Sequence, residues 1–322
     1  MVAAGPFLRA YIRRFAPKAT VHYATSMSQP FTLPSFAKIN LYLRVIGKRE
    51  DGFHELCTVF QTISMHDRIS FELADDLKLT CTDPSVPTDE SNLILKAANE
   101  LKSTFGVDAG ARIHLEKNIP SPGGLGGGSS NAVVALFGLA RLWELEVPDE
   151  RLREISASLG SDVPFFIGGG TALGTGRGEL IEPLPDIEGR FLMVVTPPVS
   201  VSTATAFAAI GAPSLTNTDS KRILRVCRNE ADAIDLHHSV LKNDFERSVF
   251  DTYPEIRSVK ETLLELGAVN AMLSGSGASV FAVFDKEETR QAAMKALDHR
   301  STWRKFAVAA ISRSEYREAF RR

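Results

Sequence analysis

Residues 120–132 contain the residue types of a phosphate-binding loop. They read Pro-Ser-Pro-Gly-Gly-Leu-Gly-Gly-Gly-Ser-Ser-Asn-Ala, and we call this stretch the glycine loop. Its five glycines are not core packing, because glycine weakens an ordinary helix or strand. Backbone N–H groups left bare at the start of a helix bind anions, and the helix dipole adds to this attraction. The stretch therefore indicates an anion site, and phosphate is the anion that it favours.

The residues on either side of the glycine loop predict the elements that hold it. Residues 111–117 alternate, with Ile113 and Leu115 on one face, which is typical of a strand. After the glycines, apolar residues recur at helical spacing, at Ala132, Leu136, Leu139 and Trp143. Ser129 or Ser130 is placed to cap the first turn of that helix. We therefore predict that the loop joins a strand to the N-terminus of a helix.

Two familiar phosphate-binding loops do not fit these residues. A Walker A loop has lysine directly after its last glycine, whereas Gly128 is followed by Ser129. The dinucleotide fingerprint would place its third glycine at Ser129, and no acidic ribose partner stands at the required distance. A flexible linker is disfavoured, because patterned elements flank the stretch and it contains prolines as well as glycines. The loop is therefore predicted to bind phosphate in another way.

Composition limits the class of protein. The chain has 322 residues, of which 44% are hydrophobic and 24% charged, as in a soluble globular protein with two subdomains or one large domain. The net charge of -2 argues against nucleic acid or a membrane surface as the main partner, and we expect no membrane-spanning run. Cys57, Cys81 and Cys227 lack metal-ligand spacing, so we expect thiols in a reducing cytoplasm.

Residues 1–33 differ from the rest of the chain and are predicted to form an N-terminal extension. They hold basic residues but no acid, and the first acid in the chain is Glu50. Such a leader is compatible with a transit peptide, so plastid-type targeting stays open. We favour two simpler interpretations, a disordered tail or a segment upstream of a true start at Met27, and we expect a cytoplasmic protein.

Polar residues outside the glycine loop are further candidates for chemistry. Lys38 and Asn40 point to the same face of a predicted strand, because they are two residues apart. A lone histidine in a loop, such as His54, is more often structural. Here the adjoining aromatic residue, and Lys38 and Asn40 on the preceding strand, make a functional role more plausible. Asp162 follows a predicted helix that ends at Gly160, and the pattern alone fits a turn residue as well as a functional acid.

The remaining pattern predicts further elements. Strands are expected at residues 36–45, 69–79, 191–195, 271–273, 278–284 and 306–311. Helices are expected at residues 92–105, 256–266 and 287–297. A second glycine-rich zone, residues 168–178, is not followed by an amphipathic helix, which favours tight turns between strands. The order of the last elements indicates a compact α+β subdomain beside the first.

Three stretches in chain order resemble the motifs of the GHMP small-molecule kinase superfamily. They are Lys38-Ile39-Asn40, the glycine loop as far as Asn131, and residues 273–277. Further blocks resemble the branch that acts on a cytidine diphosphate-linked methylerythritol, at residues 37–41, 51–54, 124–132, 161–165, 199–203 and 243–246. The triple glycine before Ser-Ser-Asn is more specific to this branch than the superfamily loop. The resemblance runs from about residue 35 to residue 311.

The resemblance implies an α+β fold with two lobes, the GHMP kinase fold. Its N-terminal lobe is similar to ribosomal protein S5 and binds ATP, and its C-terminal lobe is ferredoxin-like. We expect these lobes to comprise residues 34–190 and 191–315, with the active site in the cleft between them. We expect a monomer or homodimer whose partner is a small-molecule substrate, and neither nucleic acid nor a membrane.

The resemblance also implies the reaction, which is the ATP-dependent phosphorylation of the substrate's 2-hydroxyl, with Mg²⁺ bridging phosphate oxygens. Asp162 would accept the hydroxyl proton, and Lys38 would hold Asp162 ionised and offset negative charge in the transition state. Ser130 is a candidate magnesium ligand. The phosphates of ATP would lie over Pro120, Ser121, Pro122, Gly123, Gly124, Leu125, Gly126, Gly127, Gly128, Ser129 and Ser130.

For the substrate, the resemblance implies two aromatic rings that stack on cytosine, Phe53 and Phe207, and a residue that reads the edge of the base, His54. Asn40 and Thr203 would make polar contacts nearby. The family often has tyrosine where this chain has Phe53, a change that keeps stacking but loses a phenolic hydrogen bond. The third glycine motif is Ser274, Gly275, Ser276 and Gly277. Pro122 is a further departure and should stiffen the loop.

Two alternatives stay open. Another GHMP kinase with a different small alcohol is disfavoured by the triple glycine and by the Gly-Phe-His block at residues 52–54. A catalytically inactive GHMP-fold ligand sensor is disfavoured because a protein that only binds does not need the base Asp162 together with Lys38.

Overall fold

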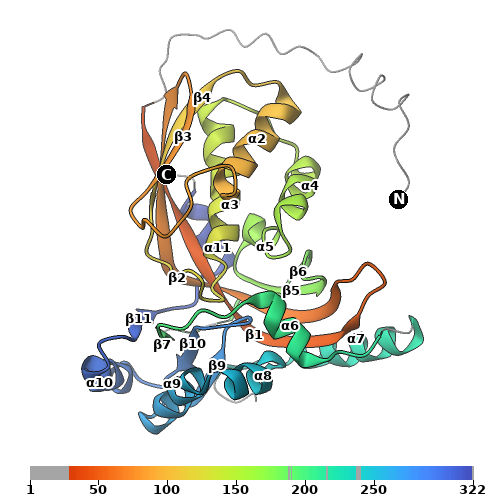
Figure 1. The fold of residues 1–322 in the computed structure, drawn as a ribbon, viewed down its shortest axis with the longest axis vertical. Coiled ribbons are helices and arrows are strands. Elements are labelled where there is room, and N and C mark those ends of the chain that lie inside the picture. The colour runs from red at the N-terminus through yellow and green to blue at the C-terminus, as the bar shows by residue number, and fades with distance from the viewer. Residues whose placement is uncertain (1–28, 188, 190, 215–216, 237–240, 321–322) are drawn as a thin grey trace.

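The computed structural model describes residues 29–187, 189, 191–214, 217–236 and 241–320. Most of the expected N-terminal extension, residues 1–28, lies outside this part of the chain. The first strand, β1 (Phe31–Lys48), begins within the last residues that we assigned to the extension. Figure 1 shows two lobes, with the N-terminal lobe above and the C-terminal lobe below.

The N-terminal lobe is built on a seven-stranded sheet. Its centre is the long antiparallel pair of β1 and β2 (His54–Ala74). The register of this pair shifts on both sides of the segment that carries Lys38 and Asn40. The other strands are β3 (Leu77–Cys81), β4 (Gly110–Glu116), β5 (Thr171–Gly176), β6 (Leu180–Pro183) and β8 (Lys242–Asn243). β8 comes from the later half of the chain and pairs with β1, so the sheet connects both halves.

Four helices pack against this sheet, as Figure 1 shows. They are α2 (Leu93–Phe105), α3 (Gly127–Leu142), α4 (Asp149–Leu159) and α5 (Phe165–Gly168). α3 is the central one and is apolar on most sides, which is typical of a helix inside a core. The core beside it joins side chains from β2, β3, β4 and all four helices. A buried α3 holds its N-terminus, and hence the glycine loop, in a fixed place.

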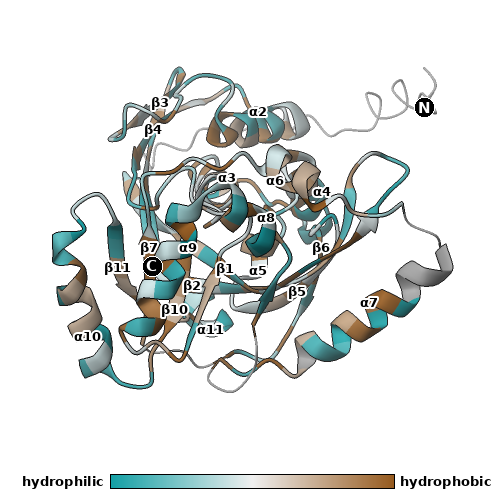
Figure 2. Cartoon of the chain, turned by 60° about the horizontal axis from the view of Figure 1, so that its bottom comes forward, coloured by the Kyte–Doolittle hydropathy of each residue, from teal (hydrophilic) through white to brown (hydrophobic). Residues whose placement is uncertain are grey.

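The C-terminal lobe contains a four-stranded antiparallel sheet in the order β11-β7-β10-β9. The strands are β7 (Leu192–Thr196), β9 (Asn270–Leu273), β10 (Val280–Val283) and β11 (Arg304–Val308). One face of this sheet packs on β1 and β2, and apolar residues of the other face pack against helices. Figure 2 accordingly shows hydrophobic residues in β7 and β10.

The remaining helices come from the later half of the chain. They are α6 (Thr203–Ile210), α7 (Asn217–Asp232), α8 (Phe245–Thr252), α9 (Pro254–Glu265), α10 (Glu287–Ala296), the short 3₁₀ helix η1 (Leu297–His299) and α11 (Arg313–Glu318). α11 returns to the N-terminal lobe, where the buried Tyr316 hydroxyl donates to the carbonyl of Phe166 on α5. This helix extends past residue 315, the expected end of the C-terminal lobe.

Most predicted elements are confirmed, and one is wrong. The strand expected at residues 111–117 is β4, and the helices expected at 92–105, 256–266 and 287–297 are α2, α9 and α10. The expected strand at residues 69–79 is instead the end of β2 and the start of β3, because the chain bends at Asp75 and Asp76. The second glycine-rich zone does form turns around β5 and β6.

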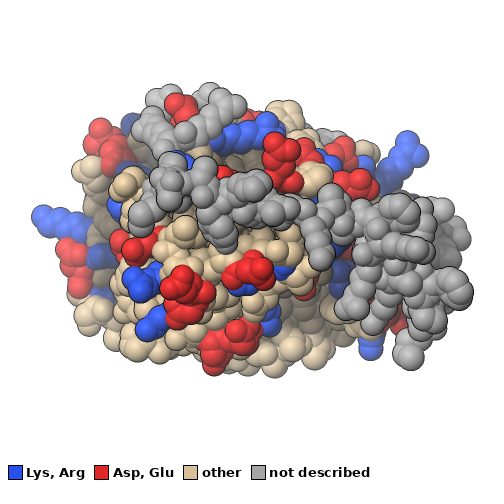
Figure 3. All heavy atoms as spheres, turned by 90° about the horizontal axis from the view of Figure 1, so that it is seen from above, with Lys and Arg blue, Asp and Glu red and all other residues tan. Residues whose placement is uncertain are grey.

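The surface of the described residues agrees with the composition. On the face drawn in Figure 3, acidic and basic side chains are interspersed, as the net charge of -2 leads one to expect. None of the helices in the described ranges is long and apolar enough to cross a lipid bilayer.

Candidate active site

The glycine loop runs from β4 to α3 and packs directly on β1. The Lys38 N–H donates a 2.9 Å hydrogen bond to the carbonyl of Leu125. A Cβ at Gly126 would lie 2.9 Å from Lys38 Cγ. A Cβ at Gly124 would lie 2.0 Å from the carbonyl oxygen of Ser274. Both glycines have φ angles near +70°, in the left-handed region, so glycine is required for conformation and for space.

α3 begins at Gly127, and the predicted capping by Ser129 or Ser130 is wrong. The N-cap is Gly126, which makes no side-chain capping bond, and both serines stand inside the first turn. The N–H of Ser130 already donates to Gly126 O at 2.9 Å. The N–H groups of Gly127, Gly128 and Ser129 precede this bond and have no partner within the helix. The helix therefore presents uncapped amides to an anion.

The structure buries Ser130, the candidate magnesium ligand. Its side chain is fully buried, and its Oγ accepts a 2.9 Å hydrogen bond from Ser35. Ser129 instead lines a cavity together with Lys38 and Asp162. The structure therefore turns Ser130 toward the core and Ser129 toward the cavity that Lys38 and Asp162 line.

Lys38 and Asp162 meet as an ion pair, with Lys38 Nζ 3.3 Å from Asp162 Oδ2. The Lys38 side chain is 4% exposed and the Asp162 side chain 36%, so the carboxylate is accessible and the ammonium is not. Lys38 Nζ also donates to Asn40 Oδ1 at 2.6 Å, and Asn40 donates to Thr58 Oγ1 at 2.8 Å. Asn40 thus fixes the position of the Lys38 ammonium through this hydrogen bond, and it lines the same cavity.

The third glycine motif closes the site from the C-terminal lobe. Ser274 Oγ donates a 3.0 Å hydrogen bond to the carbonyl of Gly124. Ser276 Oγ lies 2.9 Å from Thr203 Oγ1, at the start of α6. The Asn243 amide donates to two carbonyls of this motif, those of Leu273 and Gly275, each at 2.8 Å. All three sequence motifs therefore meet at one place.

Two adjoining cavities form the candidate site. The catalytic cavity, of about 310 Å³, is lined by Lys38, Asp162 and Ser129 among others. The aromatic cavity, of about 710 Å³, is lined by Phe53, His54 and Phe207 among others. Several residues line both, so the two cavities are continuous along the interface between the lobes.

The predicted base-binding residues gather in the aromatic cavity. The rings of His54 and Phe207 are stacked, with centroids 4.7 Å apart and an interplanar angle of 16°. Phe53 is 51% exposed, and the guanidinium of Arg177 lies 4.7 Å from the centroid of its ring. Burial and the positive charge of Lys48 lower the pKa of His54 below its ordinary value of 6.5. The imidazole is therefore neutral at pH 7, with one donor and one acceptor nitrogen.

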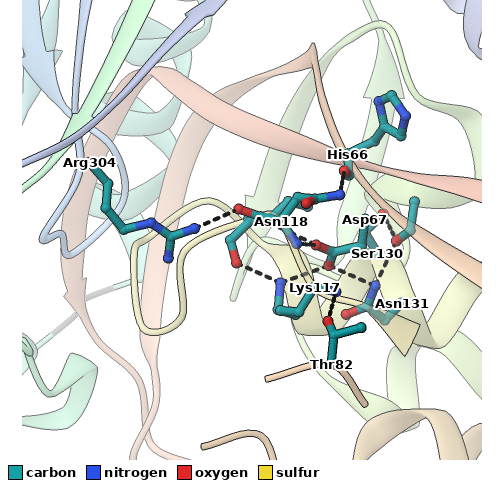
Figure 4. Close-up of polar contacts among 10 residues, drawn as sticks. His66, Asp67, Thr82, Lys117, Asn118, Ser130, Asn131 and Arg304 are labelled. Carbon is teal, nitrogen blue, oxygen red and sulfur yellow. Dashed lines mark hydrogen bonds and ion pairs between the residues drawn. The ribbon is translucent and has the colours of Figure 1, made fainter. Parts of the chain in front are cut away.

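A buried polar cluster behind the glycine loop escaped the sequence reasoning. Asp67 is fully buried and accepts a 2.7 Å hydrogen bond from Lys117 Nζ, as Figure 4 shows. It also accepts hydrogen bonds from Asn131 and from the backbone N–H groups of Asn118 and Ile119. Burial lowers the pKa of Lys117, and the negative charge of Asp67 opposes this shift. The cluster ties β2 to both ends of the loop.

Comparisons with known proteins place the chain in one family. The model of the GHMP kinases N terminal domain matches residues 92–170, and that of the GHMP kinases C terminal domain matches residues 229–301. The chain is 43% identical, over 82% of its length and 92% of the relative, to 4-diphosphocytidyl-2-C-methyl-D-erythritol kinase of Chlorobium phaeobacteroides. It is 38% identical, over 87% of its length and 98% of the relative, to the protein of that name in Geobacter metallireducens.

Solved structures of kinases are also similar to this chain. A crystal structure of 4-(cytidine 5'-diphospho)-2C-methyl-D-erythritol kinase is similar with a TM-score of 0.69 and 32% identity, over 87% of this chain and 99% of that one. A homoserine kinase from Cytophaga hutchinsonii is similar with a TM-score of 0.66 and 19% identity, over 91% of this chain and 98% of that one, which shows the fold alone.

Proposed function

Because the chain belongs to the GHMP kinases, in the family of the 4-diphosphocytidyl-2-C-methyl-D-erythritol kinases, we propose that it transfers the γ-phosphate of ATP to the 2-hydroxyl of that cytidine compound. This reaction belongs to the non-mevalonate synthesis of isoprenoid precursors. The observation that carries the proposal is the Lys38–Asp162 pair, which lies in a cavity shared with the glycine loop and adjoining an aromatic cavity.

The glycine loop and α3 are suited to hold the phosphates of ATP. The uncapped N–H groups of Gly127, Gly128 and Ser129 provide donors, and the helix dipole adds attraction for negative charge. A Cβ at Gly128 would have Leu93 Cδ1, at 3.8 Å, as its near neighbour, so the outer side of this first turn is open. The backbone, with no lysine inside the loop, binds the phosphates.

The donors in the catalytic cavity also fit magnesium. Mg²⁺ is commonly held by one or two carboxylates together with substrate phosphates and waters. Asp162 is the carboxylate among the described residues that line this cavity, and the Ser129 hydroxyl is beside it in the lining. These two residues, and not Ser130, would hold the ion. When bound, the ion neutralises charge that develops on the phosphate oxygens.

Asp162 and Lys38 have different roles in phosphoryl transfer. Asp162 accepts the proton of the attacking hydroxyl and orients the oxygen toward the phosphate. Lys38, at 3.3 Å, favours the ionised form of this carboxylate and offsets negative charge in the transition state. Because the hydrogen bond to Asn40 fixes the Lys38 side chain, the ammonium is in place before the substrates bind. Asn40 therefore also acts as a positioning residue for Lys38, beside the substrate contact that the resemblance implies.

The aromatic cavity is suited to cytosine. Phe53 and Phe207 supply flat apolar surfaces, and His54 supplies one donor and one acceptor for the edge of the base. Thr203 lines both cavities and is placed to contact the substrate between them.

A coupled assay of ADP release with three acceptors tests the proposal. We expect turnover with 4-diphosphocytidyl-2-C-methyl-D-erythritol and none with homoserine or mevalonate. Equal turnover with all three would contradict the assigned substrate. A folded protein that binds the cytidine compound without any turnover would instead be a ligand sensor.

A further inference from the structure

One charged residue lies where the two cavities of the candidate site join. If cytosine occupies the aromatic cavity and the reacting hydroxyl the catalytic cavity, the diphosphate that joins them passes the residues lining both. Among the described residues these are Leu56, Ser161, Arg177, Thr203 and Phe207. Arg177 is the charged member of these five. A diphosphate carries at least two negative charges. Among the described residues where the two cavities join, Arg177 is the cation that this diphosphate would pass.

The backbone around Arg177 holds this residue next to the reacting groups. It lies in the turn between β5 and β6, and the next residue, Gly178, is adjacent to Asp162, since a Cβ there would lie 3.9 Å from Asp162 Oδ1. On the other side, Gly176 N donates a 3.2 Å hydrogen bond to Glu55 Oε1. The turn is therefore tied to β2, the strand that begins at His54.

The side chain of Arg177 is placed between base and hydroxyl and retains free donors. Its guanidinium lies 4.7 Å from the centroid of the Phe53 ring. Its Nε lies 3.7 Å from Glu179 Oε1, and within the described ranges its two terminal nitrogens have no hydrogen-bond partner. A guanidinium presents paired N–H donors that match two phosphate oxygens. Lys38, in contrast, is already engaged by Asn40 and Asp162.

We propose that Arg177 binds the diphosphate of the substrate and thereby fixes the spacing between the cytosine and the reacting hydroxyl. This proposal rests on the proposed function and adds a specificity-determining residue to it. Phe53 has a part in the arrangement, because its exposed ring supports the guanidinium on one face. The residue selects for a nucleoside diphosphate conjugate over a free nucleoside or a small uncharged alcohol.

Binding of cytidine diphosphate and of cytidine, measured by calorimetry, tests the site without turnover. The wild type should prefer cytidine diphosphate by about 30-fold, the scale of a bidentate charge-assisted contact, and Arg177→Met should reduce this preference to below about threefold. Arg177→Lys should keep an intermediate preference for cytidine diphosphate, because lysine retains the positive charge but lacks the paired, coplanar N–H donors of the guanidinium. Cytidine itself should bind equally to all three proteins. A preference for cytidine diphosphate that survives in Arg177→Met overturns the proposal.

Steady-state kinetics provide a second test. Arg177→Met should raise the KM for the cytidine substrate by about 30-fold and leave the KM for ATP within about twofold. Arg228→Met is the matched control, since Arg228 pairs with Glu182 on β6 at 3.2 Å and lines neither cavity. A fall in kcat with both KM values unchanged would place Arg177 at the transferred phosphate and overturn the proposal.

The outcomes separate this inference from the proposed function. Turnover by the wild type with an unaltered KM in Arg177→Met overturns the inference alone. Loss of diphosphate selectivity in Arg177→Met without turnover by the wild type supports the inference and overturns the proposed reaction. Absence of both turnover and binding in the wild type overturns the two together.

Discussion

The N–H of Lys38 donates to the carbonyl of Leu125 at 2.9 Å, and this bond joins β1 to the glycine loop. The same residue reaches Asp162 with its side chain at 3.3 Å. Lys38 thus contacts the glycine loop through its backbone and the Asp162 carboxylate through its ammonium. This double attachment explains how residues remote in sequence keep a common geometry.

Replacing Asp162 should abolish most of the chemistry and also destabilise the fold. Asp162→Ala removes the proton acceptor, so kcat should fall by at least about 100-fold. The change also leaves the buried Lys38 ammonium without its counter-ion, so the free energy of unfolding should fall by up to about 3–5 kcal/mol. Stopped assays and urea unfolding measure the two quantities. A kcat near that of the wild type would exclude Asp162 as the base.

Replacing Lys38 should impair both catalysis and stability. Lys38→Met removes the charge beside the transferred phosphate, which should lower kcat by about 100-fold or more. It also leaves the buried Asn40 Oδ1 without its donor, which should cost about 1–3 kcal/mol in the free energy of unfolding. Unfolding in urea that matches the wild type would show that this hydrogen bond does not stabilise the fold.

Two glycines of the loop should respond differently to the same substitution. Gly124→Ala places a Cβ 2.0 Å from Ser274 O at a φ of +71°, so it should destabilise the protein by more than about 2 kcal/mol. Gly128→Ala is the control, because it meets Leu93 Cδ1 at an ordinary 3.8 Å inside a helix, and stability should be equal or slightly higher. Thermal unfolding compares the two. Equal losses would show that loop contacts with the third motif do not matter.

The buried Asp67–Lys117 pair should be essential for folding. Asp67→Asn leaves the Lys117 charge buried without its counter-ion and weakens four hydrogen bonds, at an expected cost of about 3–5 kcal/mol. Asp251→Asn breaks an exposed pair with Arg257 and should cost less than about 1 kcal/mol. Urea unfolding of both variants tests the contrast, and similar small costs would contradict it.

Cytidine binding should depend on the neutral form of His54. A lowered pKa means that protonation is harder in the folded protein, so the midpoint of the loss of binding should lie below pH 6.5, the ordinary pKa of histidine. His54→Gln should bind more weakly and lose this dependence, because glutamine does not titrate. Calorimetric titration of cytidine from about pH 8 to pH 5 provides the measurement. An identical decline in His54→Gln would assign the effect to another group.

Local patterns predicted much of the fold and the motifs. The alternation of residues 111–117 and the helical spacing after the glycine loop identified β4 and α3. The pattern could not locate the start of α3, because serine is a common N-cap and glycine a poor helix former, whereas here the glycines themselves form the first turn. The inward turn of Ser130 toward Ser35 likewise depends on a partner remote in sequence.

The residues that sequence reasoning missed are those whose importance lies in long-range contacts. Asp67 resembles any polar residue at the end of a strand, and Lys117 any lysine before a loop, until the fold buries them together. Arg177 stands among glycines that indicated only a turn, and its relation to Phe53 requires β2 and β5 to be paired. The expected roles of residues 1–28 stay predictions.

The pairing of β1 with β2 has a consequence for how the molecule can be divided. One apolar core contains Ile39 and Val59 from this pair together with Val194, Met272 and Phe281 from the C-terminal sheet. Backbone bonds from Ser64 to Ala309 and from Ile311 to Thr62 join the same two sheets. A cut near residue 190 would leave each fragment with half of a shared interior exposed to water. The two lobes are thus one cooperative unit, and an active site assembled from both exists only in the uncut chain.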